Sequence, residues 1–377
     1  MVPAAACFVV IAERENVVKR HAGSRAGGTV SVKVLAAQAA LLVGLAAWAA
    51  SRAADAPQGP VKSAVTLMNP GVKDQDDMCF WKHPDDPAKS IVITSDKYGN
   101  RLWVYDLEGK LLQEVAAAYP GNIDTRTGFT LGGEKIDIVV HNQRTQKRYM
   151  LKVYKVDPAE RKLVCVDNGN ITTGMNYGGC LYRSAKTGKF YFFTTSKQTG
   201  IEQIELFDDG GGKVAGRKVR SWPLGMCEGA VADDEAGLLF VAEERRGIWS
   251  FDAEADAKPE GKLVARVGQN GLARDVEGLT IMPTGDKEGF LIASSQGNNT
   301  FKVYKRAAPH EFVGTFSVAG AVETDGIDVM AGDFGEAFPE GIFACHRGRD
   351  QTRCPVLLAS WKDVAAALGA SESPGND

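Results

Sequence analysis

Acidic residues recur along the chain at a nearly constant interval. The recurring positions are separated by 47, 53, 51, 49 and 48 residues and hold Asp77, Asp124, Tyr177, Glu228, Glu277 and Asp325. One such acid could reflect only the preference of Asp and Glu for turns, but five in register call for another cause. Carboxylates gathered in one place repel one another unless a cation offsets their charge, and oxygen donors select hard ions such as calcium. The spacing therefore predicts a site for a hard cation such as calcium.

A second set of polar residues follows the first in each unit. Lys97, Arg144 and Lys197 each lie 20 residues after the first-set residue of their own unit. The equivalent points of the later units are Glu243, Gln296 and His346. Twenty residues span an antiparallel hairpin, so the second strand returns beside the start of the first. Both sets are therefore expected on one face of the fold.

The two sets divide that face by charge. The first three units supply Lys97, Arg126, Arg144 and Lys197, and the last three supply Glu228, Glu243, Asp275, Glu277, Gln296, Asp325 and Asp328. Arg126 follows Asp124 by two residues, so both side chains project from the same side of one strand. Phosphoryl transfer uses this division, with metal ions that activate a water and cations that neutralise the phosphate. The sequence has no Ser-His-Asp order and no P-loop, and its five histidines disfavour a histidine phosphatase.

The elements that position these residues follow from the repeat. Each unit of about fifty residues reads as four short β-branched and aromatic runs separated by Gly, Asp and Pro. Six such units predict an all-β fold, a six-bladed β-propeller with four-stranded antiparallel blades. The sixth unit lacks a strand, and the run SAVTL at 63–67 is expected to fill that gap and close the ring. A short C-terminal helix is expected from Trp361 to Leu368.

The N-terminus has the pattern of an export signal. Lys33 precedes an apolar run from Val34 to Ala50, and small residues follow it. We expect residues 1–54 to be a leader, 55–369 the propeller and 370–377 a disordered tail, which places the mature protein in the periplasm or outside the cell. An uncleaved anchor is the alternative, although the apolar run is short for a membrane span. The net charge of −3 offers no basic excess for nucleic acid. We expect a monomer with no stable membrane partner.

Six cysteines lie beyond the leader, and none has CxxC metal-binding spacing. Cys345 and Cys354 flank a short polar loop and could form a disulfide, which export would permit. The other four are expected to be small buried hydrophobic residues.

From about residue 74 to 345 the chain resembles the β-propeller phytases, also called alkaline phytases. The matching stretches are EGLTI at 277–281, SSQGNN at 294–299, TDGIDV at 324–329, AEE at 242–244, ADDEAG at 232–237, NID-R at 122–126 and the run from Tyr177 to Tyr191. The resemblance implies a six-bladed propeller in which some calcium ions stabilise the fold and others form the active site.

The resemblance also implies roles for individual residues. Asp76, Asp77, Glu228, Asp275, Glu277, Gln296 and Asp325 match positions that hold catalytic calcium, and Lys97, Arg126, Arg144, Tyr177 and Lys197 match positions that bind phosphate. Among these, Asp77, Glu228, Glu277 and Asp325 are expected to be essential for catalysis. The chain departs from the family pattern at Gln198-Thr199-Gly200, His346-Arg347-Gly348 and Arg245-Arg246. These changes remove negative charge near the rim and bring one or more calcium sites into question, although the central acids are retained.

The resulting hypothesis is a calcium-dependent phosphomonoester hydrolase, 3-phytase-like, that removes phosphate from phytate with a metal-activated water. Two alternatives remain open from the residues alone. A calcium lactonase of the gluconolactonase type would not need the cations opposite the acids. A non-catalytic propeller that binds calcium or polyanions is also consistent, because propellers often serve as binding platforms.

Overall fold

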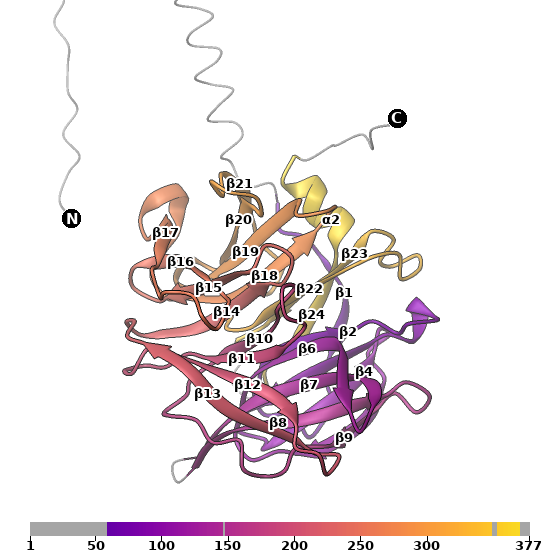
Figure 1. The fold of residues 1–377 in the computed structure, drawn as a ribbon. Helices are drawn as coiled ribbons and strands as arrows, with labels where there is room; N and C mark the ends of the chain where they lie inside the picture. Colours follow the sequence, from indigo (N-terminus) through magenta and orange to yellow (C-terminus); the bar gives the residue numbers. More distant parts are fainter. Residues whose placement is uncertain (1–58, 146–147, 349–352, 370–377) are drawn as a thin grey trace, which may run out of the picture. The chain divides into compact units, whose positions relative to one another are not determined.

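A computed structural model describes residues 59–145, 148–348 and 353–369. Within these residues the chain forms six four-stranded antiparallel sheets, which are the blades of a propeller (Figure 1). The predicted fold class is confirmed. The proposed leader at 1–54 and tail at 370–377 lie outside the described residues. Among the helices that the structure describes, none is long and apolar enough to cross a membrane.

The first three blades follow one another in the chain, each running from its innermost to its outermost strand. Blade one comprises β2 (Gln75–Trp81), β3 (Ile91–Asp96), β4 (Arg101–Asp106) and β5 (Leu111–Ala116). Blade two comprises β6 (Pro120–Leu131), β7 (Glu134–Thr145), β8 (Arg148–Asp157) and β9 (Lys162–Cys165). Blade three comprises β10 (Gly179–Arg183), β11 (Phe190–Thr194), β12 (Ile201–Asp208) and β13 (Val214–Trp222).

The last three blades complete the ring. Blade four comprises β14 (Cys227–Asp233), β15 (Leu238–Glu243), β16 (Gly247–Asp252) and β17 (Lys262–Arg266). Blade five comprises β18 (Val276–Pro283), β19 (Gly289–Ser295), β20 (Thr300–Lys305) and β21 (Phe312–Phe316). Blade six comprises β22 (Ile327–Ala331), β23 (Gly341–His346), β24 (Val356–Ser360) and, as its outermost strand, β1 (Ser63–Leu67). Helix α2 (Trp361–Ala367) follows, one residue shorter than predicted.

The ring closes through β1, as the sequence predicted. This strand pairs antiparallel with β24, with Leu67 opposite Val356. The first described strand thus completes the last blade, and both ends of the domain are held in one sheet. We call the junction of blade six with blade one the closing seam.

The hydrophobic core lies between the blades. Six clusters of buried side chains each draw on two neighbouring blades. On β2, Phe80 packs towards blade six and the adjacent Trp81 packs towards blade two, as the alternation of side chains along a strand requires. The innermost strand β2 is buried throughout, whereas the outermost strand β5 is half exposed.

Glycines allow the innermost strands to approach one another closely. A Cβ added at Gly229 would lie 2.0 Å from the carbonyl oxygen of Glu277, and one at Gly278 would lie 2.5 Å from that of Asp325. Gly178 and Gly326 are equally crowded by the next blade. Each of these glycines directly follows one of the regularly spaced residues, so only glycine lets the blades meet where those side chains project.

The disulfide that Cys345 and Cys354 could have formed is not present. Both residues are buried, and no disulfide joins them. Cys345 packs in the core between blades five and six, whereas the Cys354 thiol lies beside His346. Adjacent strand residues point to opposite faces, so Cys345 and His346 diverge and the two thiols cannot meet. Cys79, Cys180 and Cys227 are buried as expected, but Cys165 is exposed.

The closure by β1 can be tested with two leucines on outermost strands. Leu67 on β1 is fully buried, whereas Leu111 on β5 is 37% exposed. We expect Leu67→Ala to lower the free energy of unfolding by about 3 kcal/mol and Leu111→Ala by about 0.5 kcal/mol, as measured by urea denaturation. If both substitutions lowered the free energy of unfolding by the same small amount, β1 would not close the ring.

Candidate active site

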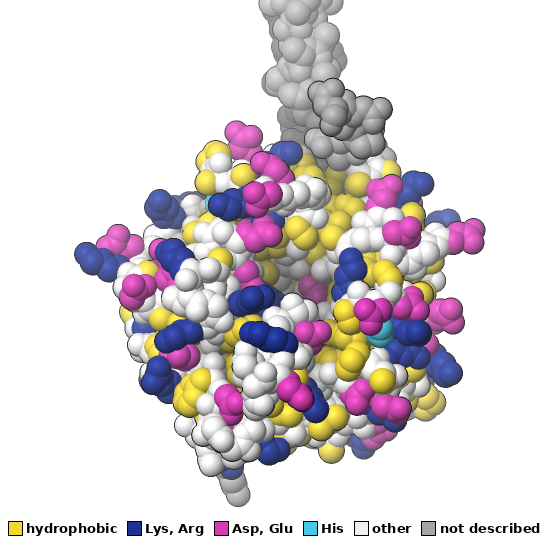
Figure 2. Space-filling view, turned by 45° about the vertical axis from the view of Figure 1, so that its right-hand side comes forward, with side chains coloured by type: hydrophobic (Ala, Val, Ile, Leu, Met, Phe, Trp, Pro, Cys, Tyr) yellow, Lys and Arg dark blue, Asp and Glu magenta, His cyan; other side chains and the backbone are white. Residues whose placement is uncertain are grey.

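The candidate site lies where the innermost strands begin. The pairing of β2, β6, β14 and β18 with their neighbours is interrupted by a register shift at this point. Such bulges redirect side chains at the ends of strands. Figure 2 shows one face of the propeller, which is hollowed at its centre and has Lys, Arg, Asp and Glu side chains around the hollow.

The basic side of the site contains Lys97, Arg144 and Lys197. Lys97 pairs with Asp76 and lies 3.4 Å from Asp74 Oδ2. Arg144 is almost fully buried and lies 3.4 Å from both Asp76 Oδ2 and Glu228 Oε1. The structure therefore brings the predicted cations next to the predicted acids.

Tyr177 lies between two of these cations. The Arg144 guanidinium is 4.9 Å from the centre of its ring, and the Lys197 ammonium is 3.9 Å away. The Tyr177 hydroxyl is hydrogen-bonded to Glu228, and burial together with that carboxylate raises the pKa of the hydroxyl. The ring thus orients two cations without neutralising their charge.

Carboxyl groups gather on the opposite side of the site. Glu228, Glu277 and Asp325 are within electrostatic range of one another, and the Asp325 and Asp76 carboxyl groups are hydrogen-bonded. Two carboxyl groups in that contact need a proton or a cation between them. We call Asp76, Glu228, Glu244, Glu277 and Asp325 the acidic cluster.

The pKa values in the acidic cluster differ according to the charges nearby. Burial would raise the pKa of Asp76, but Lys97 and Arg144 lower it to about 2. Burial raises the pKa of Glu228 to about 7, although Arg144 opposes the shift. The pKa values of Glu277 and Asp325 are raised well above their ordinary range, first by burial and then by neighbouring carboxylates.

Glu277 is the member of the cluster with the least compensation. Its Oε2 atom is buried and has no hydrogen-bond partner among the described residues. A buried carboxylate without a partner is costly, and Glu228 and Glu244 add negative charge beside it. The residues at this position therefore fit a hard cation such as calcium, whose ligands are carboxylate oxygens.

Two other predicted metal ligands border the cluster. The Gln296 side chain donates a hydrogen bond to Asp325 Oδ1. Asp275 is exposed, and its backbone N–H donates to the carbonyl oxygen of Glu244 at 2.9 Å. Both residues lie at the edge of the acidic cluster.

The structure turns Glu243 away from the cluster and places Glu244 in it. Glu243 accepts a hydrogen bond from Trp249 Nε1 at 2.7 Å and lies 3.7 Å from Arg246 Nε. The neighbouring Glu244 is close enough to Glu277 to raise its pKa. The consecutive glutamates at 243–244 signalled an acid here, but the sequence alone did not indicate which one faces inwards. Asp74, beside Lys97, was also missed.

Asp77 and Asp328 lie deeper, in the central channel. They line a cavity of about 470 Å³ together with Asp124, Arg126 and Asp234. Asp77 accepts a hydrogen bond from the backbone N–H of Ile123 in the next blade. Asp328 accepts one from Phe80, and burial raises its pKa to about 7. These carboxylates fasten blade to blade. Burial, and then the Asp76 and Asp328 carboxylates, raise the pKa of Asp77 well above its ordinary value, so Asp77 lies between the acidic cluster and the channel.

Arg126 also lies in the channel. It donates to Asp124 Oδ1 and Asp234 Oδ2, each at 2.9 Å, and to the carbonyl oxygen of Leu181 at 3.0 Å. The two carboxylates raise its pKa against the effect of burial. The role in phosphate binding remains a prediction, but these contacts already occupy the guanidinium.

Comparison with known proteins shows the family of this chain. The sequence profile described as "Phytase" matches residues 30–373. The 3-phytase of Bacillus subtilis (strain 168) is 39% identical over 310 residues, which are 78% of this chain and 81% of that protein. The chain belongs to the phytase family. The predicted family and the prediction of an enzyme are thereby confirmed.

Similar solved structures show the fold alone. An auxiliary nutrient binding protein from Bacteroides thetaiotaomicron has a TM-score of 0.50 at 9% identity, covering 80% of this chain and 76% of its own. A gluconolactonase from Xanthomonas campestris has a TM-score of 0.47 at 13% identity, covering 81% and 98%.

The two possible roles of Arg126 predict different results. Arg126→Ala would leave Asp124 and Asp234 without their cation, so we expect the free energy of unfolding to fall by about 3 kcal/mol. The KM of the folded variant should change little. Lys197→Ala is the matched control. Because Lys197 is exposed, this substitution should change the free energy of unfolding by less than about 0.5 kcal/mol. It should, however, raise KM. A raised KM with unchanged stability for Arg126→Ala would instead support phosphate binding.

Proposed function

We propose that this protein is a calcium-dependent phytase that hydrolyses phosphate monoesters of phytate. The observation that carries the proposal is the buried Glu277 Oε2 atom, which has no hydrogen-bond partner among the described residues and lies in an acidic cluster that faces Lys97, Arg144 and Lys197. A polyanionic ester needs the cations, and the cluster needs metal ions. The family membership of the chain supports the same reaction.

The acidic cluster would hold the calcium ions, with Gln296 and Asp275 at its edge. When bound, calcium supplies positive charge that stabilises the phosphoryl oxygens and promotes attack by a water. The protein contributes fixed carboxylates, since Lys97 and Arg144 keep Asp76 ionised. Glu228 is anchored by Arg144 and Tyr177, so its carboxylate is held in place before the substrate arrives.

The basic side would orient the ester. Lys197 is exposed and makes its described contact with the Tyr177 ring, so its ammonium can reach a phosphate without breaking an ion pair. Lys97 and Arg144 are already paired with Asp76 and can bind phosphate once calcium takes over that carboxylate. We therefore infer that calcium and phosphate bind cooperatively. Calcium would free Lys97 and Arg144 to bind phosphate, and phosphate would free Asp76 to bind calcium.

The decisive experiment measures phosphate release from phytate with and without calcium. Glu277→Gln keeps the shape of the side chain but removes its charge, so we expect turnover to fall at least about a hundredfold, as for the loss of a metal ligand in a shared cluster. Glu228→Ala tests the same assignment, because Glu228 lies beside Glu277 in the acidic cluster. Glu205→Gln on blade three is the matched control, because Glu205 pairs with Lys189 and Arg217 away from the site.

Several results would contradict the proposal. Wild-type turnover that persists in chelator would exclude the calcium requirement. Near-wild-type rates in Glu277→Gln would remove the acidic cluster from the mechanism. Calcium and phytate binding without any phosphate release would instead support a non-catalytic binding protein.

The raised pKa of Glu228 predicts how pH affects the metal-free protein. Between its ordinary value of 4.5 and about 7, the folded state holds a proton that the unfolded state releases. This contribution to stability is present at low pH and is lost as the pH rises through that window. We therefore expect the melting temperature in chelator to fall between about pH 4.5 and pH 7.

With calcium bound, the melting temperature should instead rise with pH, because calcium takes the place of the proton on Glu228. Below about pH 7 the affinity for calcium should weaken by about tenfold per pH unit for each proton displaced, so activity should decline towards acid pH. Melting curves with and without calcium across this range provide the measurement. An optimum near pH 4–5 that is insensitive to chelator would contradict the account.

A further inference from the structure

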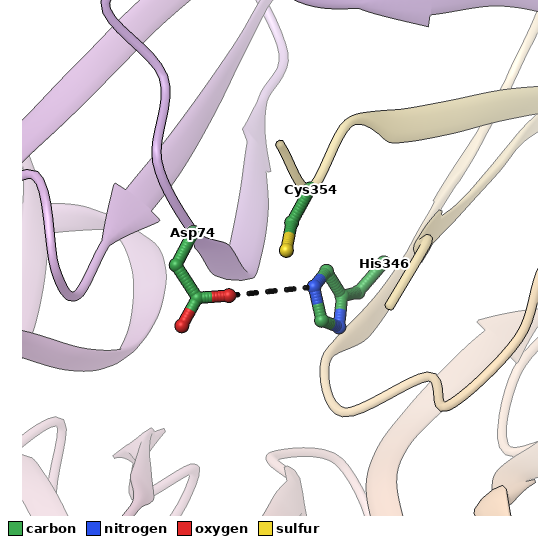
Figure 3. Close-up of side chains that lie close together, drawn as sticks. All are labelled: Asp74, His346 and Cys354. Atoms are coloured by element: carbon green, nitrogen blue, oxygen red, sulfur yellow. Dashed lines mark ion pairs between the residues drawn. The ribbon is translucent and has the colours of Figure 1, made fainter. Parts of the chain in front are cut away.

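A second group of potential metal ligands lies at the closing seam, beside the acidic cluster. Asp74, His346 and Cys354 are all buried, and each offers one ligand atom within 4.8 Å of the others. Figure 3 shows the three side chains converging on one point. His346 Nε2 is 3.9 Å from Asp74 Oδ1.

The three residues come from both sides of the seam. Asp74 directly precedes β2 of blade one, His346 ends β23 of blade six, and Cys354 lies just before β24. The backbone around them is fixed, because the Gln75 side chain donates hydrogen bonds to the carbonyl oxygens of Leu67 and Cys354 at 3.0 and 3.2 Å. The group is therefore held in place by rigid elements and needs only small movements to contract around an ion.

The donor types differ from those of the acidic cluster. A thiolate, an imidazole and one carboxylate oxygen suit a borderline-soft divalent ion such as zinc, whereas calcium prefers oxygen ligands alone. Three protein ligands leave a fourth position for water. His346, which departs from the family pattern, supplies the nitrogen ligand that distinguishes this group from the acidic cluster.

We propose that Asp74, His346 and Cys354 bind one zinc ion, or a divalent ion of the same class, that fastens blade six to blade one. This inference does not depend on the phosphate chemistry. The ion would act on the same junction that β1 closes. Calcium would not replace it there, because calcium binds thiolate and imidazole poorly.

The surroundings of the three ligands are consistent with this site. His346 Nδ1 accepts a hydrogen bond from the backbone N–H of Asp325 at 3.3 Å and lies 3.7 Å from Asp325 Oδ2. For Nε2 to bind a metal, the ring proton has to move to Nδ1, and a small turn of the ring would then direct that proton to the Asp325 carboxylate. Lys97 lies near the other oxygen of Asp74, Oδ2. One oxygen of Asp74 therefore remains directed towards the site.

Cobalt(II) provides a direct test because its thiolate complexes absorb in the near ultraviolet. Reduced full-length protein with calcium in excess, which occupies the oxygen-only sites, is titrated with cobalt and then with zinc. We expect one cobalt per chain with a thiolate charge-transfer band, displaced by zinc. Zinc should also raise the melting temperature, since it binds only the folded state.

Variants assign the ligands. Cys354→Ser should abolish the charge-transfer band, and His346→Gln should weaken cobalt binding at least about tenfold. Cys165→Ser is the matched control, because that thiol is exposed and lies on blade two; it should retain the full band. If Cys354→Ser does not fold, the wild-type titration and His346→Gln still decide the question. Cobalt bound by the wild type without a thiolate band, or a band that Cys165→Ser removes, would overturn the proposal.

Discussion

The close contact of the six innermost strands is the constraint on which the rest of this structure depends. At Gly229 and Gly278 no room remains even for a methyl group, because the carbonyl oxygen of the next blade lies within 2.0 to 2.5 Å of where a Cβ would be. The acids that precede these glycines, Glu228 and Glu277, are carried into the same small region as Asp325. The geometry of the ring therefore brings these carboxyl groups close together. The function of the site depends on what compensates their negative charge.

The compensation within the protein is incomplete. Two like charges about 4 Å apart near a protein surface repel each other by about 4 kcal/mol, more than an exposed ion pair contributes. A chain of contacts from Lys97 through Asp76 and Arg144 to Glu228 offsets part of this repulsion. Glu277 lies outside that chain. An unfavourable arrangement of this kind is stable when a ligand supplies the missing charge, which is why the acidic cluster is best understood as one half of a metal site.

Repetition made much of the fold predictable. The constant spacing specified six blades, and the missing strand of the sixth unit pointed to the run at 63–67. The same spacing placed Lys97, Arg144 and Lys197 on the face that carries the acids, because a hairpin of constant length returns each second strand to the same level. These inferences needed only the period of the repeat and the geometry of antiparallel strands.

Side-chain direction was less predictable. The register shifts at the starts of β2, β14 and β18 displace the alternation by which a strand assigns its side chains to faces. Glu243 and Glu244 are adjacent at the end of β15 and point to opposite sides, and Glu244 is the one that faces inwards. The direction of a side chain also depends on partners from other blades, as with Arg126, which is held in the channel by Asp234 of blade four. A pattern within one unit contains no information about such partners.

Anomalous diffraction from crystals grown in calcium tests the central claim most directly. The account predicts anomalous density at the acidic cluster, within bonding distance of Glu277 and of at least one of Glu228 and Asp325. Crystals at saturating calcium that show no such density, with these carboxyl groups hydrogen-bonded to one another, would contradict it.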